Sequence, residues 1–270
     1  MNETIAPRTD TRLQKKLPTI HYQVAMPQPE NHLFEVTLHL VGYAFSILDL
    51  KLPVWTPGSY LVREYAKHLQ GFTAFANNKP LNWRKISKNH WQVETDKVSE
   101  VTIKYRIFAN ELTVRTNHLD STHGYFNGAA LFFRLPKFDK QPIFVTIVTP
   151  RSEWRGTTAI PPVPGQVNTF CALDFDTLVD SPFEIGSHQL YHFQVLDKPH
   201  ELAIWGRGNF QVQQMIADIS KIIEVEAQIF GGLPYERYVF LVHLFAQAYG
   251  GLEHKNSCSL IYQRFGFRDR

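Results

Sequence analysis

The sequence predicts a mainly β fold whose first part is a β-sandwich-like domain. Residues 20–24, 33–41 and 101–108 alternate apolar and polar side chains, which is the pattern of strands with one buried face. Prolines, glycines and asparagines separate such runs at short intervals, as they do between the strands of a sandwich. A helical period of 3.6 residues is sustained at one place, residues 209–230. We therefore expect many strands and one long helix.

Further apolar runs extend this pattern and divide the chain near residue 180. In the first part, they predict strands at 45–52, 72–75, 81–83, 91–94, 129–133, 142–148 and 170–175. In the second part, they predict strands at 183–193, 201–205, 238–245 and 259–262. Asn209 is the expected N-cap of the long helix, and Gly231 with Gly232 is its expected stop. The predicted organisation is a disordered tail (1–17), an all-β domain (18–179) and the beginning of an α+β domain (180–270).

Length and composition limit the class of protein. A chain of 270 residues with 44% hydrophobic residues can bury one large core or two ordinary ones. The net charge is only +3, and the scattered basic residues do not predict a nucleic-acid partner. Cys171 and Cys258 are far apart, which suits reduced thiols. Residues 1–17 lack the apolar core of a signal peptide, and no run approaches the ~18 apolar residues of a membrane span. We expect a cytoplasmic protein without a membrane partner.

Residues 53–60 break the strand pattern with two prolines and a glycine. Pro57-Gly58 favours a tight turn, because proline presets one dihedral angle and glycine accepts the positive φ that follows. Arg63 and Glu64 come next, in a segment that suits a short helix. Two interpretations of Arg63 stay open. It serves the fold through an ion pair or a helix cap, or it belongs to a loop at the domain seam, close to a substrate cleft.

Residues 249–257, Tyr-Gly-Gly-Leu-Glu-His-Lys-Asn-Ser, lie between two apolar runs. The adjacent glycines suggest a strand edge whose backbone another group approaches closely. An extended peptide can add itself to such an edge as an extra strand, with Glu253 placed to meet a positive charge. The alternative is a Gly-Gly turn between two strands with a solvated tip.

Two groups of histidines could in principle bind a metal ion, but their sequence neighbours do not suggest a metal site. His118, Asp120 and His123 form a His-x-Asp-x-x-His cluster. Their threonine, serine and glycine neighbours favour a polar loop over a metal site. His188 and His192 lie on one face of a predicted strand without a paired carboxylate or thiol. We interpret each of them as a surface or packed histidine.

Two motifs carry a resemblance to a known family. Residues 249–257 resemble the substrate-binding segment of the glycyl aminopeptidase family of zinc metallopeptidases (family sixty-one). They are also similar in role to the Gly-x-Met-Glu-Asn segment of aminopeptidase N relatives. Residues 53–63, Pro-Val-Trp-Thr-Pro-Gly-Ser-Tyr-Leu-Val-Arg, resemble the signature of that family's N-terminal domain. The resemblance covers nearly the whole chain, and it implies that the second part is the incomplete start of a thermolysin-like peptidase domain.

The resemblance also implies a substrate and a set of binding residues. The complete enzyme would be a zinc-dependent aminopeptidase, a hydrolase that releases glycine or another small residue from the N-terminus of a peptide. Gly250, Gly251 and Leu252 would pair with the peptide backbone as an added strand. Glu253 would bind the free α-amino group, and His254 would help to orient Glu253 or the substrate.

The catalytic metal motif of such an enzyme is missing from the sequence. Zinc peptidases of this kind use His-Glu-x-x-His on a helix, and none of the 12 histidines is followed by Glu-x-x-His. We therefore expect this chain to bind no zinc and to be inactive alone, as a piece truncated before the zinc helix, a gene fragment or a degenerate relative. Exposed strand surface in the truncated part would favour self-association. The alternative is a non-catalytic β-rich module that binds peptides or a partner protein.

Other catalytic motifs are weak or missing. The sequence contains no Gly-x-Ser-x-Gly elbow, no P-loop and no dinucleotide-binding fingerprint. Cys258 and His254 are close in sequence, and this proximity is the only support for a Cys–His nucleophile.

Overall fold

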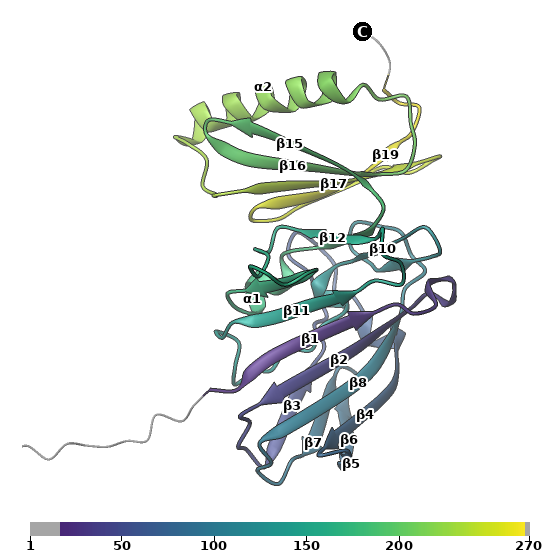
Figure 1. The fold of residues 1–270 in the computed structure, drawn as a ribbon, viewed down its shortest axis with the longest axis vertical. Coiled ribbons are helices and arrows are strands. Elements are labelled where there is room, and N and C mark those ends of the chain that lie inside the picture. The colour runs from purple at the N-terminus through teal and green to yellow at the C-terminus, as the bar shows by residue number, and fades with distance from the viewer. Residues whose placement is uncertain (1–16, 268–270) are drawn as a thin grey trace, which may run out of the picture.

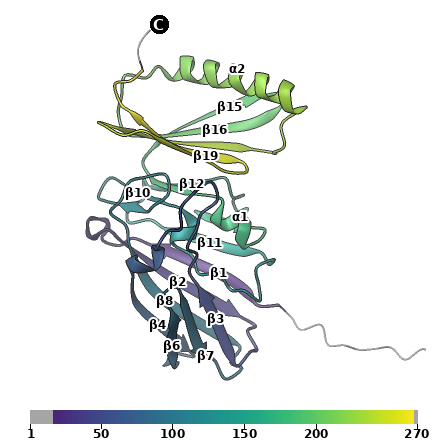
Figure 2. The same cartoon turned by 180° about the vertical axis from the view of Figure 1, so that it is seen from behind.

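The computed structural model describes residues 17–267 as four β-sheets with two α-helices (Figure 1). The mainly β prediction is therefore confirmed, whereas the predicted tail lies outside the described residues except for Leu17. The seven-stranded and three-stranded sheets form one end of the molecule, and the five-stranded sheet forms the other (Figures 1 and 2). The four-stranded sheet lies between them. Three short 3₁₀ helices complete the fold: η1 (Pro29–Asn31), η2 (Tyr65–His68) and η3 (Gly128–Ala130).

The seven-stranded sheet contains most of the strands that the alternating pattern predicted. It consists of β1 (Thr19–Ala25), β2 (Leu33–Val41), β4 (Leu69–Ala76), β5 (Lys79–Pro80), β8 (Glu100–Phe108), β11 (Ile143–Val148) and β13 (Thr169–Ala172). Their order is β13-β11-β1-β2-β8-β4-β5. β1 and β11 are parallel, and the other neighbours are antiparallel. Ile20, Tyr22 and Val24 of β1 are all buried, as a period of two requires for a strand with one face on the core.

A three-stranded sheet packs against the seven-stranded sheet. It consists of β3 (Ile47–Lys51), β7 (His90–Glu94) and β6 (Trp83–Ser87), in that order. Aromatic rings join the two sheets. The ring centroid of Phe133 lies 5.2 Å from that of Trp91 on β7 and 5.9 Å from that of Phe72 on β4. The two sheets therefore share one core.

The predicted strand at 129–133 is wrong, because the chain is irregular after η3. This segment is nevertheless buried throughout. The hydroxyl of Tyr22 donates to the carbonyl of Phe133 at 2.6 Å, and the hydroxyl of Tyr105 donates to the carbonyl of Leu131 at 2.9 Å. These side-chain hydrogen bonds take the place of a strand ladder, so an apolar segment fills the core without joining a sheet.

The four-stranded sheet corrects two predictions. It consists of β12 (Arg155–Thr158), β14 (Phe183–Gly186), β10 (His123–Phe126) and β9 (His118–Leu119), in that order. β9 and β10 lie within 117–127, where the sequence predicted a polar loop, and all residues of β10 are buried. The single strand predicted at 183–193 is two strands in different sheets, because β14 ends at Gly186 and the next strand joins the five-stranded sheet.

α1 (Phe175–Val179) begins where the sequence predicted the end of a strand, 170–175. Asp174 is the N-cap, and its side chain accepts a hydrogen bond from the backbone N–H of Thr177 at 2.8 Å. This cap turns the chain into the helix, so the preceding strand is shorter than predicted.

The five-stranded sheet carries the long helix. Its strands, in spatial order, are β15 (Gln189–Val195), β16 (Lys198–Trp205), β17 (Tyr238–Phe245), β19 (Ser257–Gln263) and β18 (Gly250–Glu253). α2 (Val212–Phe230) connects the parallel neighbours β16 and β17 and covers the face that points away from the other sheets (Figures 1 and 2). No helix within residues 17–267 combines the length and hydropathy needed to cross a membrane.

The two ends of α2 differ in how well the sequence predicted them. Gly231 adopts a left-handed conformation with a φ of 78° and ends the helix, as predicted. The N-cap prediction is wrong, because Gln211 precedes the first helical residue. Asn209 lies two residues before this position, and its backbone N–H donates to the carbonyl of Arg264 at 3.0 Å.

The two faces of the five-stranded sheet have different partners, because side chains alternate along each strand. Leu202 of β16 and Val242 of β17 pack toward α2. Ala203 and Leu241, on the opposite face, pack with Tyr125 of β10. We call this second contact, between the five-stranded and four-stranded sheets, the seam. The seven-, three- and four-stranded sheets are called the N-terminal unit.

Replacement of Ile223 in α2 by alanine should lower the free energy of unfolding by about 2 kcal/mol, because this side chain is buried beneath the helix. Ile222→Ala is the matched control. The side chain of Ile222 is exposed, so this change should cost less than about 0.5 kcal/mol. Urea denaturation followed by circular dichroism measures both losses. Equal losses would contradict the packing of α2 through Ile223.

Candidate functional site

The predicted Gly-Gly-Leu-Glu segment forms β18, which is an edge strand of the five-stranded sheet. β18 pairs antiparallel with β19, so that Gly251 lies opposite Leu260 and Glu253 lies opposite Cys258. On its other side, no strand of the described chain pairs with it. The side chain of Leu252 is fully buried, whereas Glu253 is exposed. The strand is therefore anchored in the sheet while its carboxylate remains accessible.

The Pro57-Gly58 loop contacts this edge strand. Gly58 has a φ of +77°, and a Cβ atom there would lie 2.6 Å from Cδ1 of Leu252 and 3.3 Å from the carbonyl oxygen of Glu253. The absence of a side chain at Gly58 is what allows the loop to approach β18 so closely. The two sequence motifs, far apart in the chain, thus meet where the Pro57-Gly58 loop touches β18.

Arg63 contributes to the internal structure of this loop. Its Nε donates to the hydroxyl of Ser59 at 3.4 Å, and the indole N–H of Trp55 donates to the carbonyl of Ser59 at 2.6 Å. The short helix predicted for the segment of Arg63 and Glu64 is η2, which begins only at Tyr65, with Glu64 at its N-cap position. These contacts fix the shape of the loop, whose Gly58 approaches β18.

The turn that follows β18 is attached to the N-terminal unit through Asp180. Nδ1 of His254 lies 3.0 Å from Oδ1 of Asp180, and the backbone N–H of Lys255 donates to Oδ2 at 2.9 Å. The side chain of His254 has no exposed surface. Nη2 of Arg115 also donates to the carbonyl of Gly251, at 3.4 Å. Contacts from the N-terminal unit therefore fix both the middle and the end of the edge strand.

A groove of about 760 Å³ lies next to this turn. Trp55 and Pro57 of the loop line it together with Phe175, Asp180 and Lys255. The mixture of apolar and charged groups suits a peptide more than a purely apolar ligand. The sequence did not predict this groove, because its walls come from segments that only the fold brings together.

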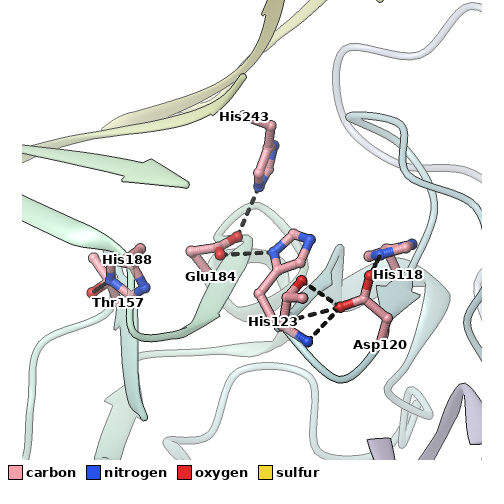
Figure 3. A network of polar contacts seen from close by, with 8 residues as sticks. His118, Asp120, His123, Thr157, Glu184, His188 and His243 are labelled. Carbon is pink, nitrogen blue, oxygen red and sulfur yellow. Dashed lines mark hydrogen bonds and ion pairs between the residues drawn. The ribbon is translucent and has the colours of Figure 1, made fainter. Parts of the chain in front are cut away.

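A second cluster of polar side chains is buried at the seam (Figure 3). The carboxylate of Glu184 on β14 accepts hydrogen bonds from Nδ1 of His123 on β10 at 2.9 Å and from Nε2 of His243 on β17 at 2.7 Å. All three side chains have at most 1% exposed surface. The ring of Trp205 stacks on His123 with a centroid distance of 3.8 Å. This cluster joins the five-stranded sheet to the N-terminal unit.

Glu184 is ionised in this cluster. Burial alone would raise the pKa of its carboxyl group, but the electrostatic attraction of the neighbouring His123 and His243 rings and the hydrogen bonds that they donate outweigh burial. The pKa of Glu184 is therefore held well below its usual range. Neither Glu184 nor His243 was predicted as a site residue. The one local signal is that each interrupts an apolar run with a single polar residue.

The His-x-Asp-x-x-His motif lies next to Glu184. Nε2 of His118 is 3.2 Å from Oδ2 of Asp120, and the rings of His118 and His123 have a centroid distance of 5.0 Å (Figure 3). Burial would raise the pKa of Asp120, but hydrogen bonds from Thr122 and from the backbone of His123 lower it to about 2. These residues belong to strands and their connecting turn, and they meet Glu184, a neighbour that the sequence did not suggest.

The other two histidines of the sequence analysis are separated by the fold. His188 is packed, with Nε2 at 2.7 Å from the hydroxyl of Thr157, whereas the side chain of His192 on β15 is 67% exposed. The sequence analysis interpreted each of them as a packed or surface histidine, and this is confirmed: His188 is packed and His192 lies at the surface.

Residues 21–187 match the family model of the Peptidase M61 N-terminal domain, which spans more than half of the chain. The chain belongs to this family. The resemblance found in the sequence is confirmed.

Solved structures of two other proteins share the fold. The aminopeptidase N family protein from Idiomarina loihiensis has a TM-score of 0.88 and 32% identity, over 93% of this chain and 44% of that protein. An M1 zinc metallopeptidase mutant from Deinococcus radiodurans, bound to a Tyr-Ser-Ala substrate, has a TM-score of 0.53 and 14% identity, over 89% of this chain and 58% of that protein. The chain thus spans less than two thirds of either relative. No curated protein matches it.

The zinc of the Deinococcus metallopeptidase raises the question of whether residues of this M61 domain can hold a catalytic zinc ion. A His-Glu-x-x-His site needs two imidazoles on one helix face. Neither α1 nor α2 contains a histidine. The described residues therefore do not fit that site, and no catalytic step through zinc is derived from them.

Replacement of Gly58 by alanine should lower the free energy of unfolding by about 2 kcal/mol, from the positive φ and from the contact with Leu252. Gly165→Ala is the matched control. Gly165 has a φ of +75° but no neighbour within 4 Å, so it should lose only about 1 kcal/mol for its backbone conformation. Urea denaturation compares the two. If both variants lose the same free energy, the close approach of the loop to β18 is wrong.

Cys258 should react with iodoacetamide much more slowly than Cys171 in the folded protein. Burial raises the pKa of Cys258 to about 12, whereas Cys171 is partly exposed. Mass spectrometry of the labelled peptides gives both rates, and unfolding in urea should make them equal. Faster labelling of Cys258 in the folded state would restore the Cys–His hypothesis.

Proposed function

We propose that this M61 N-terminal domain chain is the front portion of a zinc-dependent aminopeptidase, and that β18 receives the free N-terminus of a peptide. In the complete enzyme, a thermolysin-like domain would supply the zinc and the water that attacks the first peptide bond. The family resemblance supports a preference for N-terminal glycine or another small residue. This chain alone would bind peptides without hydrolysing them.

The edge position of β18 is the observation that carries this proposal. An extended peptide can add to the free side of β18 through main-chain hydrogen bonds. The exposed carboxylate of Glu253 lies at the end of this strand and suits a charge-assisted hydrogen bond to an α-ammonium group. Gly250 and Gly251 add no side chain that would hinder the approach of a second backbone.

The surroundings of β18 support the same role. Asp180 holds the turn after Glu253, so the carboxylate is presented from a fixed backbone. The hydrogen bond from Arg115 to the carbonyl of Gly251 is long, at 3.4 Å, and a peptide N–H could compete with it. The groove beside Lys255 offers space for residues further along the peptide.

Replacement of Glu253 by glutamine should weaken the binding of a peptide with a free N-terminal glycine by about tenfold or more, because it removes a charged hydrogen-bond acceptor. Fluorescence anisotropy with a hexapeptide labelled at its C-terminus measures the affinity. Glu226→Gln, on the exposed side of α2, is the matched control and should not change it. N-terminal acetylation of the peptide should cause the same loss as Glu253→Gln.

The alternative is a non-catalytic module that binds peptides or proteins through the same edge. It would bind the acetylated and free peptides equally, and Glu253→Gln would have no effect. Release of glycine by this chain alone would contradict the predicted inactivity. Zinc-dependent hydrolysis by a longer chain that includes a His-Glu-x-x-His segment would favour the aminopeptidase.

A further inference from the structure

We infer that His118, Asp120 and His123 form a binding site for a divalent transition metal, with zinc as the best fit. His118 on β9 and His123 on β10 belong to paired strands, and Asp120 lies in the turn between them. One ligand atom from each residue lies within 4.8 Å of the other two. Two imidazole nitrogens and a carboxylate oxygen are a donor set that zinc takes in proteins.

The separation of the ligand atoms suits a metal ion. Nε2 of His118 and Oδ2 of Asp120 are 3.2 Å apart. Two ligands at about 2.0–2.1 Å from one tetrahedral zinc ion are separated by roughly 3.3 Å. For a hydrogen bond from a ring N–H to a carboxylate, 3.2 Å is long. The pair can therefore accept an ion with little movement.

An unpartnered nitrogen of His123 points to a missing ligand. The side chain is fully buried, yet Nε2 has no hydrogen-bond partner. Buried polar atoms without a partner are rare and destabilising. Since Nδ1 is held by Glu184, Nε2 is directed away from it, and the ring of His123 lies between Glu184 and His118 (Figure 3). A metal ion bound with Asp120 would give this nitrogen a partner.

Neighbouring groups already fix the orientation of two of the three ligands, His123 and Asp120. Glu184 accepts the Nδ1–H of His123, which is the carboxylate–histidine–metal arrangement of many zinc sites. The stacked ring of Trp205 holds the plane of the same imidazole. Oδ1 of Asp120 accepts from the backbone and hydroxyl of Thr122, which leaves Oδ2 directed to His118. The site is thus prearranged without an ion.

Accessibility distinguishes this site from the neighbouring His123, Glu184 and His243. The second group is closed by its own hydrogen bonds and has at most 1% exposed surface. By contrast, the side chain of Asp120 is 32% exposed and that of His118 is 12% exposed. An ion can therefore enter beside Asp120, and water can complete its coordination. Calcium and magnesium are poor candidates, because they prefer sites made of oxygen atoms.

Isothermal titration of the untagged chain, stripped of metal by a chelator, with ZnCl₂ at neutral pH tests this site. We expect one zinc ion per chain and a higher melting temperature in its presence. His118→Ala should weaken binding by about tenfold or more. His192→Ala is the matched control, because this exposed histidine belongs to neither metal-ligating group, and it should bind like the parent chain. Cobalt(II) should give a visible absorption band that His118→Ala removes.

Three outcomes would overturn the inference: no zinc binding by the parent chain, equal affinity in His118→Ala, or a cobalt spectrum that His118→Ala leaves unchanged. Circular dichroism checks that the variant is folded. If it is not folded, Asp120→Asn replaces it, because the amide oxygen can keep the Oδ1 hydrogen bonds while an NH₂ group, which does not bind zinc, takes the place of Oδ2. That variant should show the same loss of affinity, and unchanged binding would contradict the site.

Discussion

The arrangement of the two ends of the molecule depends on one buried carboxylate. Glu184 is ionised and only 1% exposed to solvent, so its charge must be compensated within the protein. Two imidazoles do this, and they come from opposite sides of the seam, His123 from the four-stranded sheet and His243 from the five-stranded sheet. A shift of β17 would remove His243, one of the two partners of this buried carboxylate. The relative position of the two sheets at the seam is thus fixed mainly by the high free-energy cost of separating Glu184 from its histidine partners.

The edge strand depends on the same seam for its position. Its neighbour β19 is held by the hydrogen bond from the hydroxyl of Tyr125 to that of Ser259, at 2.8 Å. β18 itself is approached by Gly58 and followed by a turn that Asp180 holds. Tyr125, Gly58 and Asp180 all lie outside the five-stranded sheet. The position of Glu253 therefore depends on contacts from both ends of the molecule. This explains why the two sequence motifs belong together.

Strands with one buried face could be predicted from the sequence, because alternation directly reports an exposed and a buried side. β2, predicted at 33–41, has exactly the bounds expected from that pattern. The predictions failed at 117–127, where β10 is buried along its whole length, and at 129–133, where every residue is buried. Such segments have no period, and their hydrogen-bond partners, such as Tyr22, are distant in sequence. The backbone partners of these segments are set by the fold as a whole.

Some parts of the candidate site could likewise be predicted from local sequence, whereas others depend on the fold. The glycines and Glu253 are contiguous, so an edge strand could be proposed from local sequence, whereas the partners of His123 are set by topology alone. The topology also limits where a peptide can bind. α2 covers one face of the five-stranded sheet and the seam covers the other, so an added strand can reach only its edges, β15 or β18. β15 carries a side chain at every position, whereas β18 begins with two glycines and ends with an exposed carboxylate. Of the two edges, β18 therefore offers the accessible backbone and the charge that a peptide N-terminus needs.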